Sequence, residues 1–534
     1  MSKFNTTQAR SRRGDGIVET TNVTVNHKGT KAYERTAKSE LFLLGISDFV
    51  EDTFYESAGN RQDRIDVLVK QIVVEDLDWL KNFVAWLRNE ANMRSVSLSI
   101  ALKAAHAMNE QGITGARQLV SSALIRADEP GEALAFWHGQ YGRKIPSAVK
   151  RGIADAAVKS YNEYSYAKYD SERNGYRFAD VIQLTHPSPK DDYQNALFKF
   201  ALDKSYNSGT VVPEELTKLR KRQILLSLPK DELRAKIVSP DGADILASAG
   251  LTWEALSGSI SGGMDASAWE AVIPSMGYMA LLRNLRNFHD ANVSREVLKG
   301  VADRLSDKAE VARSRQLPFR FLSAYRMLSA AGYNYFLTAL EDALEHSLAN
   351  VPALDGNNLV VIDNSGSMYG GWGDRGKMSL ADTANLFGVA LAKRAESATV
   401  VLYGSESRVL TFRKGASTFS VINGITHMGG TDTYGTLAKH YNKSYTRVIH
   451  LTDEQYGSSY GWGYYGGRSG KLPYDLIDKA TPVYTWNLAG YKAGNKAEPN
   501  RYALGGLSDS SFKVIPLIEA GKNAQWPWEV DKTS

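Results

Sequence analysis

The sequence predicts a multidomain protein in which an all-α, solenoid-like region precedes an α/β domain. Between residues 38 and 350, apolar residues recur at three- and four-residue spacing, which is typical of amphipathic helices. After residue 351, short β-branched runs alternate with helical stretches, as in a mostly parallel sheet covered on both faces. Because a single hydrophobic core stops growing at about 300 residues, a chain of 534 residues also requires at least two domains.

The helical zone is interrupted only at short clusters of turn residues. Apolar side chains repeat on one helix face in residues 65–73, 80–87 and 281–288, and breaks fall at residues 128–131, 186–189 and 239–242. Helices of this length favour a HEAT-like solenoid, in which each helix pair buries its apolar face by stacking on its neighbours. No fixed repeat period is visible, so a globular helical domain is the alternative.

The α/β zone begins with a strand predicted at residues 358–363, followed by a helix at 377–394. Further strands are predicted at residues 399–403, 409–412, 447–451 and 482–487, and further helices at 436–441 and 473–479. In such a fold the ligand lies at the carboxyl ends of the strands. We divide the chain into a flexible basic tail (1–30), a helical domain (31–350) and an α/β domain (351–534).

Composition excludes several classes of protein. Hydrophobic content of 43% and charged content of 23% are ordinary for a globular chain. The absence of cysteine rules out disulfides, thiolate zinc sites and cysteine nucleophiles. The basic N-terminus lacks the apolar core of a secretory signal, and no apolar run has the roughly 20 residues needed to span a bilayer. We therefore expect a cytoplasmic protein without a membrane partner.

Oxygen-bearing side chains gather where two predicted strands end. The sequence DNSGS at residues 363–367 follows the first strand, GGTDT at 429–433 forms a later loop, and LTD at 451–453 ends another strand. Hydroxyl and carboxylate oxygens are the ligands that Mg²⁺ prefers. They predict a site for Mg²⁺, with Mn²⁺ possible, made by Asp363, Ser365, Ser367, Thr431 and Asp453. The alternative is that Asp363 caps a helix and the serines satisfy turn amides.

The order and spacing of these three segments resemble the metal-ion-dependent adhesion site of von Willebrand A domains. That resemblance implies a coordination position left open for an acidic group of a partner protein. No general base lies in the motif, so hydrolysis is not implied and we do not expect an enzyme. Residues 371–378 nearly spell a phosphate-binding P-loop, but Met378 stands where Ser or Thr would hold Mg²⁺.

Cations and tyrosines are interleaved between residues 143 and 177. Clustered cations attract a phosphate backbone through counterion release, and aromatic rings stack on unpaired bases. The alternative is a solvated helix face. The cations here include Arg143, Lys144, Lys150, Arg151, Lys168 and Arg173, and the tyrosines are Tyr161, Tyr164, Tyr166, Tyr169 and Tyr176. A second basic run, KLRKR at residues 218–222, suits a phosphate-facing helix.

Several segments resemble the TROVE module of Ro autoantigens. They are GRKIP at 142–146, AVKRG at 148–152, RNGY at 173–176, DVIQLTHP at 180–187, MALLRNLRN at 279–287 and LPFRFL at 317–322. With the C-terminal von Willebrand A-like domain, the resemblance covers the chain from about residue 20 onward. It implies a bacterial or phage Ro orthologue, built as a ring of helical repeats closed by that domain.

The resemblance to Ro proteins also implies RNA partners. Small structured Y RNAs would bind the basic outer surface, and single-stranded 3′ ends of misfolded non-coding RNA would enter the central hole. Lys168, Arg173 and His186 fall where the family places Y RNA contacts. Arg283 and Arg286, three residues apart on one helix, either line the hole or pair with nearby carboxylates.

Two functions follow from these observations. The first is a monomeric ring that binds non-coding RNA in quality control, or as a scaffold for an exoribonuclease. The second is a protein-interaction adaptor that captures an acidic partner through the metal site, with the helical array only as scaffold. A metal-dependent hydrolase would need a general base that the sequence does not offer.

Overall fold

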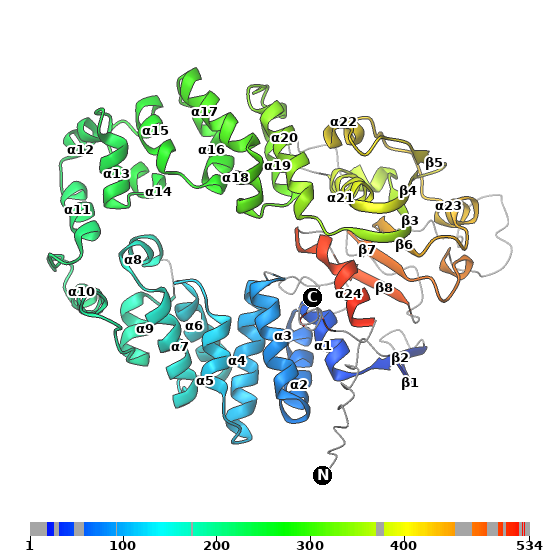
Figure 1. Ribbon diagram of the computed structural model, residues 1–534, viewed down its shortest axis with the longest axis horizontal. Coiled ribbons are helices and arrows are strands. Elements are labelled where there is room, and N and C mark those ends of the chain that lie inside the picture. Colours follow the sequence, from blue (N-terminus) through cyan, green and yellow to red (C-terminus); the bar gives the residue numbers. More distant parts are fainter. Residues whose placement is uncertain are drawn as a thin grey trace, which may run out of the picture.

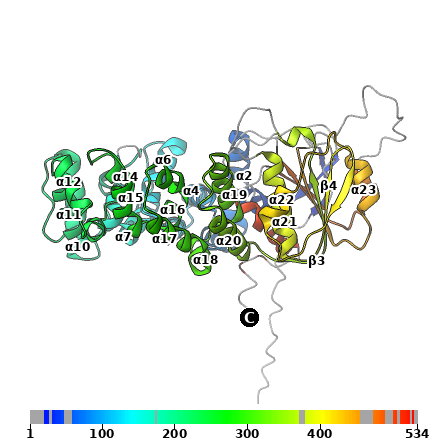
Figure 2. The ribbon, with the colours of Figure 1, turned by 90° about the horizontal axis from the view of Figure 1, so that it is seen from above.

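Helices α1 (Ala37–Ile46) to α20 (Leu337–Ser347) form a curved array that the C-terminal α/β domain completes into a ring (Figure 1). The computed structural model describes residues 19–25, 31–46, 58–91, 93–171, 175–369, 379–453, 473–488, 500–505, 509–522, 526 and 528. Seen from above, the array is a flat slab that the α/β domain continues at one end (Figure 2).

The helices between these two ends follow one another around the ring. In the first half they are α2 (Ala58–Glu75), α3 (Leu77–Asn89), α4 (Arg94–Glu110), α5 (Ala116–Ala123), α6 (Glu129–Tyr141), α7 (Ser147–Ser160), α8 (Glu163–Tyr169), α9 (Phe178–Thr185) and α10 (Asp192–Tyr206). In the second half they are α11 (Thr217–Leu226), α12 (Lys230–Ile237), α13 (Gly242–Ala249), α14 (Trp253–Ser257), α15 (Ala266–Val272), α16 (Tyr278–Asp290), α17 (Arg295–Ser306), α18 (Lys308–Ser314) and α19 (Pro318–Ala330).

Neighbouring helices of the array are held by close packing and by ion pairs. Helix α7 lies between α5 and α9, and it approaches α5 so closely that a Cβ at Gly152 would lie 2.7 Å from the carbonyl oxygen of Arg117. Arg117 on α5 also binds Asp155 on α7, with 2.6 Å between Nε and Oδ2. Each helix is therefore buried mainly by its neighbours along the array, as a solenoid requires.

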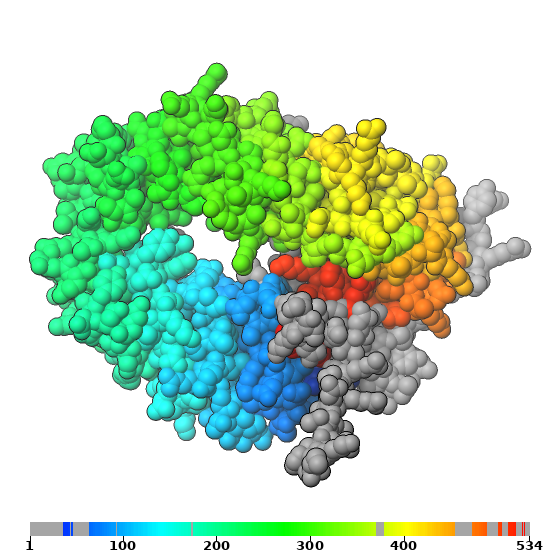
Figure 3. All heavy atoms as spheres, in the orientation of Figure 1, coloured from blue at the N-terminus to red at the C-terminus, as the bar shows by residue number. Residues whose placement is uncertain are grey.

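The array surrounds an open hole. The space-filling view shows an opening through the molecule, bordered by the helical array and by the α/β domain (Figure 3). The predicted HEAT-like ring is confirmed, and the alternative of a globular helical domain is wrong because its helices would have filled this space.

The boundary predicted for the flexible N-terminal tail, residue 30, is wrong, because a strand forms before it. Residues 19–25 form strand β1 (Glu19–Val25), which pairs antiparallel with β2 (Lys31–Arg35). The sequence ETTNVTV is rich in threonine and valine, whose β-branched side chains favour strands, and this signal was overlooked beside the basic residues. The rest of the predicted tail lies outside the described residues.

The α/β domain is built on a six-stranded sheet of order β5-β4-β3-β6-β7-β8, parallel except for the edge strand β5. The predicted parallel sheet is confirmed, while β8 was not predicted and residues 473–476 form a 3-10 turn where a helix was expected. The strands are β3 (Leu354–Asp363), β4 (Ala395–Tyr403), β5 (Ser407–Leu410), β6 (Arg447–Thr452), β7 (Val483–Asn487) and β8 (Arg501–Gly505). The helices are α21 (Leu380–Arg394), α22 (Thr418–Asn423), α23 (Thr433–His440) and α24 (Val514–Lys522).

Side chains alternate between two apolar layers along the central strands. Val360 and Ile362 of β3 face the core that the sheet shares with α21 and with the helical array, whereas Leu359 and Val361 face a smaller core with α23. This alternation is the period-two pattern of a strand covered on both faces. Because the larger core is continuous with the array, the ring and the α/β domain form one packed body.

Tryptophans near the C-terminus close the ring. Trp526 packs against Trp79 of α3 with ring centroids 5.0 Å apart, and Trp528 packs against Trp86 at 6.0 Å. On the other side of the domain, Arg326 of α19 binds Asp382 of α21, with 2.7 Å between nitrogen and oxygen. Both ends of the helical array are thereby attached to the α/β domain. Among the described helices, none combines the length and apolar character needed to cross a membrane.

Candidate metal site and candidate RNA-binding surfaces

The candidate metal site lies at the carboxyl ends of the two central strands. Strands β3 and β6 are parallel and adjacent, with Ile362 opposite Leu451, so Asp363 and Asp453 emerge at the same edge of the sheet. Both aspartate side chains are fully buried. Two carboxylates buried at one edge are costly unless a positive charge or hydrogen bonds compensate them.

Asp363 is held by hydrogen bonds from three elements. Its Oδ1 accepts from the backbone N–H of Ser365 at 2.8 Å. Its Oδ2 accepts from the Thr452 hydroxyl at 2.9 Å and from the Tyr403 hydroxyl at 3.2 Å. Burial raises the pKa of Asp363, and the charge of Asp453 adds to that rise, while the hydrogen bonds from Ser365 and Thr452 oppose it.

The serine hydroxyls converge beside this carboxylate. The Oγ atoms of Ser365 and Ser367 are 3.2 Å apart, and Ser365 is buried whereas Ser367 is exposed. The 3-10 turn η3 (Gly366–Tyr369) turns the chain directly after the strand. Two hydroxyls therefore lie close together next to Asp363.

The loop that carries Thr431 lies against the serine loop. The backbone N–H of Gly366 donates to the carbonyl of Gly429 at 2.8 Å, and that of Met428 donates to the carbonyl of Asn364 at 2.7 Å. The Thr431 loop also lies against the end of β4, where residue 404 must be a glycine. A Cβ at Gly404 would lie 2.3 Å from the carbonyl oxygen of Met428. Thr431, half-buried, is thus placed in the same cluster of loops.

The predicted ligands are therefore gathered at one place, and their chemistry fits a hard cation. Capping alone accounts for the bond between Asp363 and the Ser365 amide, but it does not account for a second buried carboxylate, Asp453, at the same edge. Carboxylate and hydroxyl oxygens suit Mg²⁺ or Mn²⁺. Metal binding itself stays a prediction.

A buried chain of polar groups beneath the site was missed at the sequence level. Tyr403, which donates to Asp363, also contacts Nε2 of His450 at 2.8 Å, and Nδ1 of His450 contacts the Tyr474 hydroxyl at 2.7 Å. Complete burial lowers the pKa of His450 to about 3, so the imidazole is neutral at physiological pH. The sequence does not indicate this chain of contacts, because a polar residue at an inward-facing position of β4 or β6 does not reveal which side chain it will contact.

The predicted RNA-binding cations at the start of α7 are at the surface. Arg143, Lys144 and Arg151 are exposed and Lys150 is half-buried. No ion pair engages these four residues within the part of the chain that the structure describes. They present positive charge that no neighbouring carboxylate cancels.

Lys168 and His186 are also exposed. The Lys168 ammonium lies 5.1 Å from the ring centroid of Tyr169 and 5.7 Å from that of Tyr164, a cation–π arrangement. His186 ends α9 in the left-handed conformation, with φ of 51°. Arg173 lies outside the described residues.

Two of the interleaved tyrosines are core residues. Tyr161 and Tyr166 are buried, and Tyr161 stacks on Phe178 with ring centroids 3.7 Å apart. The prediction that the interleaved tyrosines stack on RNA bases is therefore wrong for Tyr161, because its ring is covered. Tyr164 is half exposed and is available to a ligand.

The two arginines of α16 differ. Both are exposed on the helix, but Arg286 pairs with Asp290, with 3.4 Å between Nε and Oδ2. No ion pair holds Arg283 among the described residues. Helix α16 lies nearer the hole than α17 does (Figure 1). The ion-pair alternative therefore holds for Arg286, whereas the lining of the hole by Arg283 stays a prediction.

Part of the helical array matches a known domain, and the whole fold has a counterpart among solved structures. Residues 242–337 match the family model described as the TROVE domain. The second half of the helical array therefore contains a region similar to TROVE domains. The crystal structure of the Ro (RSR) protein of Deinococcus radiodurans has the same fold, with a TM-score of 0.67, 17% sequence identity, and coverage of 92% of this chain and 100% of that one. No curated protein sequence matches the chain.

The match to the TROVE family model includes only some of the segments that resemble Ro proteins. The segments at 279–287 and 317–322 lie inside residues 242–337, whereas the segments between 142 and 187 lie before them. The P-loop-like residues 371–378 and the Gly/Tyr-rich residues 456–470 lie outside the described residues. Of the candidate site residues, Arg283 and Arg286 lie inside the matched residues and the others lie outside them.

Proposed function

We propose that this TROVE-domain ring is an RNA-binding protein that takes structured non-coding RNA on its outer surface and single-stranded RNA ends in its hole. The observation that carries the proposal is the open ring together with Arg143, Lys144 and Arg151, exposed cations that have no ion pair among the described residues. A polyanion would release counterions from such a surface and gain affinity.

The region around α7 is the proposed surface for structured RNA. It presents Arg143, Lys144, Lys150 and Arg151 as uncompensated charges, with Lys168 and His186 exposed farther along the array. The hole is the proposed path for a single-stranded 3′ end, and Arg283, an exposed cation on α16, is proposed to contact it. We extend the proposal to RNA quality control, or to a scaffold for an exoribonuclease, by analogy with the family.

Binding of labelled RNA at several salt concentrations tests this function. The probes are a small hairpin RNA with a single-stranded 3′ extension and the same hairpin without it. The double substitution Lys150→Ala with Arg151→Ala is expected to weaken both probes and to reduce the slope of log affinity against log salt by about 1.5 to 2. Arg283→Ala is expected to weaken only the extended probe.

Arg286→Ala is the matched control for Arg283→Ala, because Arg286 lies on the same helix but is already paired with Asp290. If the wild-type protein has no affinity for either RNA at low salt, RNA binding is excluded.

We also propose that Asp363, Ser365, Ser367, Thr431 and Asp453 hold Mg²⁺ or Mn²⁺. The support is the pair of buried carboxylates at one sheet edge with two hydroxyls 3.2 Å apart beside them. When bound, the cation would offer a coordination position to an acidic group of a partner. The protein's own part is to fix the ligands, since Thr452 and Tyr403 orient Asp363.

A protein-interaction adaptor is therefore the second candidate function, and it is compatible with the first. The two are separated by substitution. Asp363→Ala is expected to abolish capture of an acidic partner and to leave RNA affinity unchanged, whereas substitutions around α7 have the opposite effect. A non-enzymatic, monomeric and cytoplasmic protein belongs to this proposal, because one chain closes the ring and the lack of cysteine fits a reducing compartment.

A further inference from the structure

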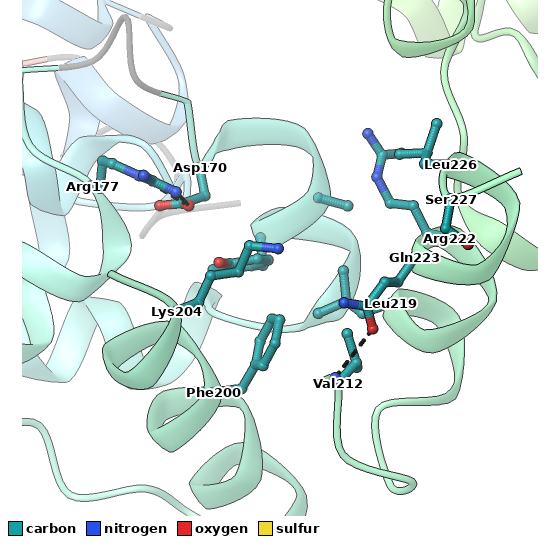
Figure 4. Close-up of a pocket in the computed structure, with 12 residues that line it drawn as sticks. Asp170, Arg177, Phe200, Lys204, Val212, Leu219, Arg222, Gln223, Leu226 and Ser227 are labelled. Atoms are coloured by element: carbon teal, nitrogen blue, oxygen red, sulfur yellow. Dashed lines mark hydrogen bonds and ion pairs between the residues drawn. The ribbon is translucent and has the colours of Figure 1, made fainter. Parts of the chain in front are cut away.

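A cavity of about 400 Å³ lies in the wall of the ring, among α8, α9, α10 and α11 (Figure 4). Its volume falls in the range of small-ligand sites. None of the residues singled out from the Ro resemblance lines it. It occurs where the array changes from α10 to α11 through the connection at residues 207–216.

The walls of this cavity are fixed by buried hydrogen bonds. Glu163, at the start of α8, accepts from the backbone N–H of Leu219 on α11 at 2.6 Å and from the Tyr193 hydroxyl of α10 at 3.0 Å. Gln223 on α11 accepts from the backbone N–H of Val212 at 3.2 Å, so the connection is held against the helix (Figure 4). The cavity is therefore a preformed feature of the array.

The charged residues that line the cavity have a net charge of +2. Arg177 binds Asp170 on one wall, with 2.5 Å between nitrogen and oxygen. Lys204 and Arg222 are the remaining charged residues of the lining, and neither has an ion pair among the described residues. In Figure 4, Lys204 and Arg222 approach the cavity from opposite sides.

Arg222 is only partly satisfied by the protein. Its one hydrogen bond among the described residues runs from Nη1 to the carbonyl of Gly250 at 3.0 Å. Burial lowers its pKa, which means that the charge is desolvated without a compensating carboxylate. A guanidinium has five N–H donors, so most remain available to an anion.

Apolar side chains also line the cavity. Leu226, which is exposed, belongs to this lining together with the buried Val212, Leu219 and Phe200, whose ring centroid lies 5.6 Å from the Lys204 ammonium. A ligand that matches this lining has an apolar part and an anionic part.

We propose that this cavity binds one unpaired nucleotide, with its phosphate between Lys204 and Arg222 and its base against Leu226 and the neighbouring aliphatic side chains. The inference rests on the proposed RNA-binding function and adds a specific subsite to it. The nucleotide belongs either to a bound RNA or to a free nucleoside monophosphate, which share this chemistry. Both sources are distinguished below.

The test compares two hairpin RNAs that differ only by a single-nucleotide bulge carrying the fluorescent base 2-aminopurine. Lys204→Ala is expected to weaken the bulged RNA by about tenfold and the fully paired RNA by much less. Lys199→Ala is the matched control, because Lys199 is exposed on the same helix and does not line the cavity. Arg222→Lys, which keeps the charge but loses the planar fork, is expected to give an intermediate loss.

Each outcome decides the inference. A bulge-specific loss in Lys204→Ala, with a change in 2-aminopurine fluorescence that the variant lacks, supports an RNA nucleotide in the cavity. Saturable binding of AMP that is lost in Lys204→Ala supports a free nucleotide. Equal weakening of both RNAs, indistinguishable from Lys199→Ala and without AMP binding, overturns the subsite but leaves RNA binding intact. Failure of the wild-type protein to bind either RNA removes the proposed function itself.

Discussion

The indole of Trp526 packs edge-on against the ring of Phe42, with centroids 5.2 Å apart and planes at 60°. Phe42 belongs to α1 at the start of the array, whereas Trp526 follows α24 in the chain. Both side chains are fully buried. This contact joins residues 484 positions apart and closes the ring.

Removal of the closing contact should loosen the ring. Trp526→Ala deletes a fully buried side chain that packs against Phe42 and Trp79, and such a deletion costs about 3 to 5 kcal/mol. A lower thermal midpoint and a larger radius of gyration by small-angle X-ray scattering are the expected results. Tyr206→Ala is the control, since Tyr206 is 74% exposed. An unchanged midpoint in Trp526→Ala would show that the ring does not depend on this contact.

A buried ion-pair cluster should stabilise the first repeats. Glu129 is fully buried and binds Arg88 at 2.7 Å and Arg94 at 2.8 Å. Burial by itself would raise the pKa of Glu129, but backbone N–H groups of Arg126 and Ile125 and the charge of Arg88 lower it. Glu129→Gln leaves buried guanidinium charge uncompensated, at a cost of about 3 to 5 kcal/mol.

The urea midpoint measures this cost. The exposed Glu214, which binds Arg220 at the surface, provides the matched control Glu214→Gln, for which a change below about 1 kcal/mol is expected. Equal midpoints for the two variants would contradict the assigned role of Glu129.

The buried His450 under the candidate metal site should make the protein acid-sensitive. The folded-state pKa of His450 is about 3, below its ordinary value of 6.5, so the unfolded chain binds the additional proton between these values. The contribution of the neutral His450 to the free energy of unfolding is therefore fully present above pH 6.5 and is lost as pH falls toward 3. Within that window the slope contributed is about 1.4 kcal/mol per pH unit.

His450→Gln should remove that slope while lowering stability at neutral pH, because the contacts with Tyr403 and Tyr474 change. Thermal midpoints between about pH 4 and pH 7 measure the slope. His289→Gln, at an exposed position, should keep it. If His450→Gln has the same acid slope as the wild type, the neutral buried imidazole is not its source.

Stabilisation by Mg²⁺ should increase with pH. The pKa of Asp363 is raised above its ordinary value of 3.8, so the stability linked to this carboxyl is present at acid pH and is lost as pH rises through the raised value. A bound cation removes that loss, because it compensates the ionised carboxylate. The Mg²⁺-induced rise in thermal midpoint should therefore be larger at about pH 8 than at about pH 5.

Asp363→Asn should lose this response to Mg²⁺. Asp355→Asn should retain it, because Asp355 is exposed at the opposite end of the same strand. A wild-type midpoint that does not respond to Mg²⁺ or Mn²⁺ at any pH would exclude the metal site.

Local pattern determined which elements form and where the chain changes from one architecture to the other. Apolar spacing of three and four residues defined the helices because each buries one face, and β-branched runs bounded by turn residues defined the central strands. The DNSGS, GGTDT and LTD segments indicated the metal site because their order matched strand ends that parallel pairing brings together. Short elements with weak patterns, β1 and β8, were not predicted.

Only the tertiary structure decided which side chains meet across long separations. The packing of Trp526 on Phe42 and the contacts of Tyr403 with Asp363 and His450 are not encoded by any local spacing. The same holds for the placement of Lys204 and Arg222 around one cavity. Burial likewise distinguished Tyr161, a core residue, from the exposed Tyr164, although both stand in one tyrosine-rich segment. A sequence records which groups are available, whereas the packing of the closed ring determines which of them face one another, which are buried and which face solvent.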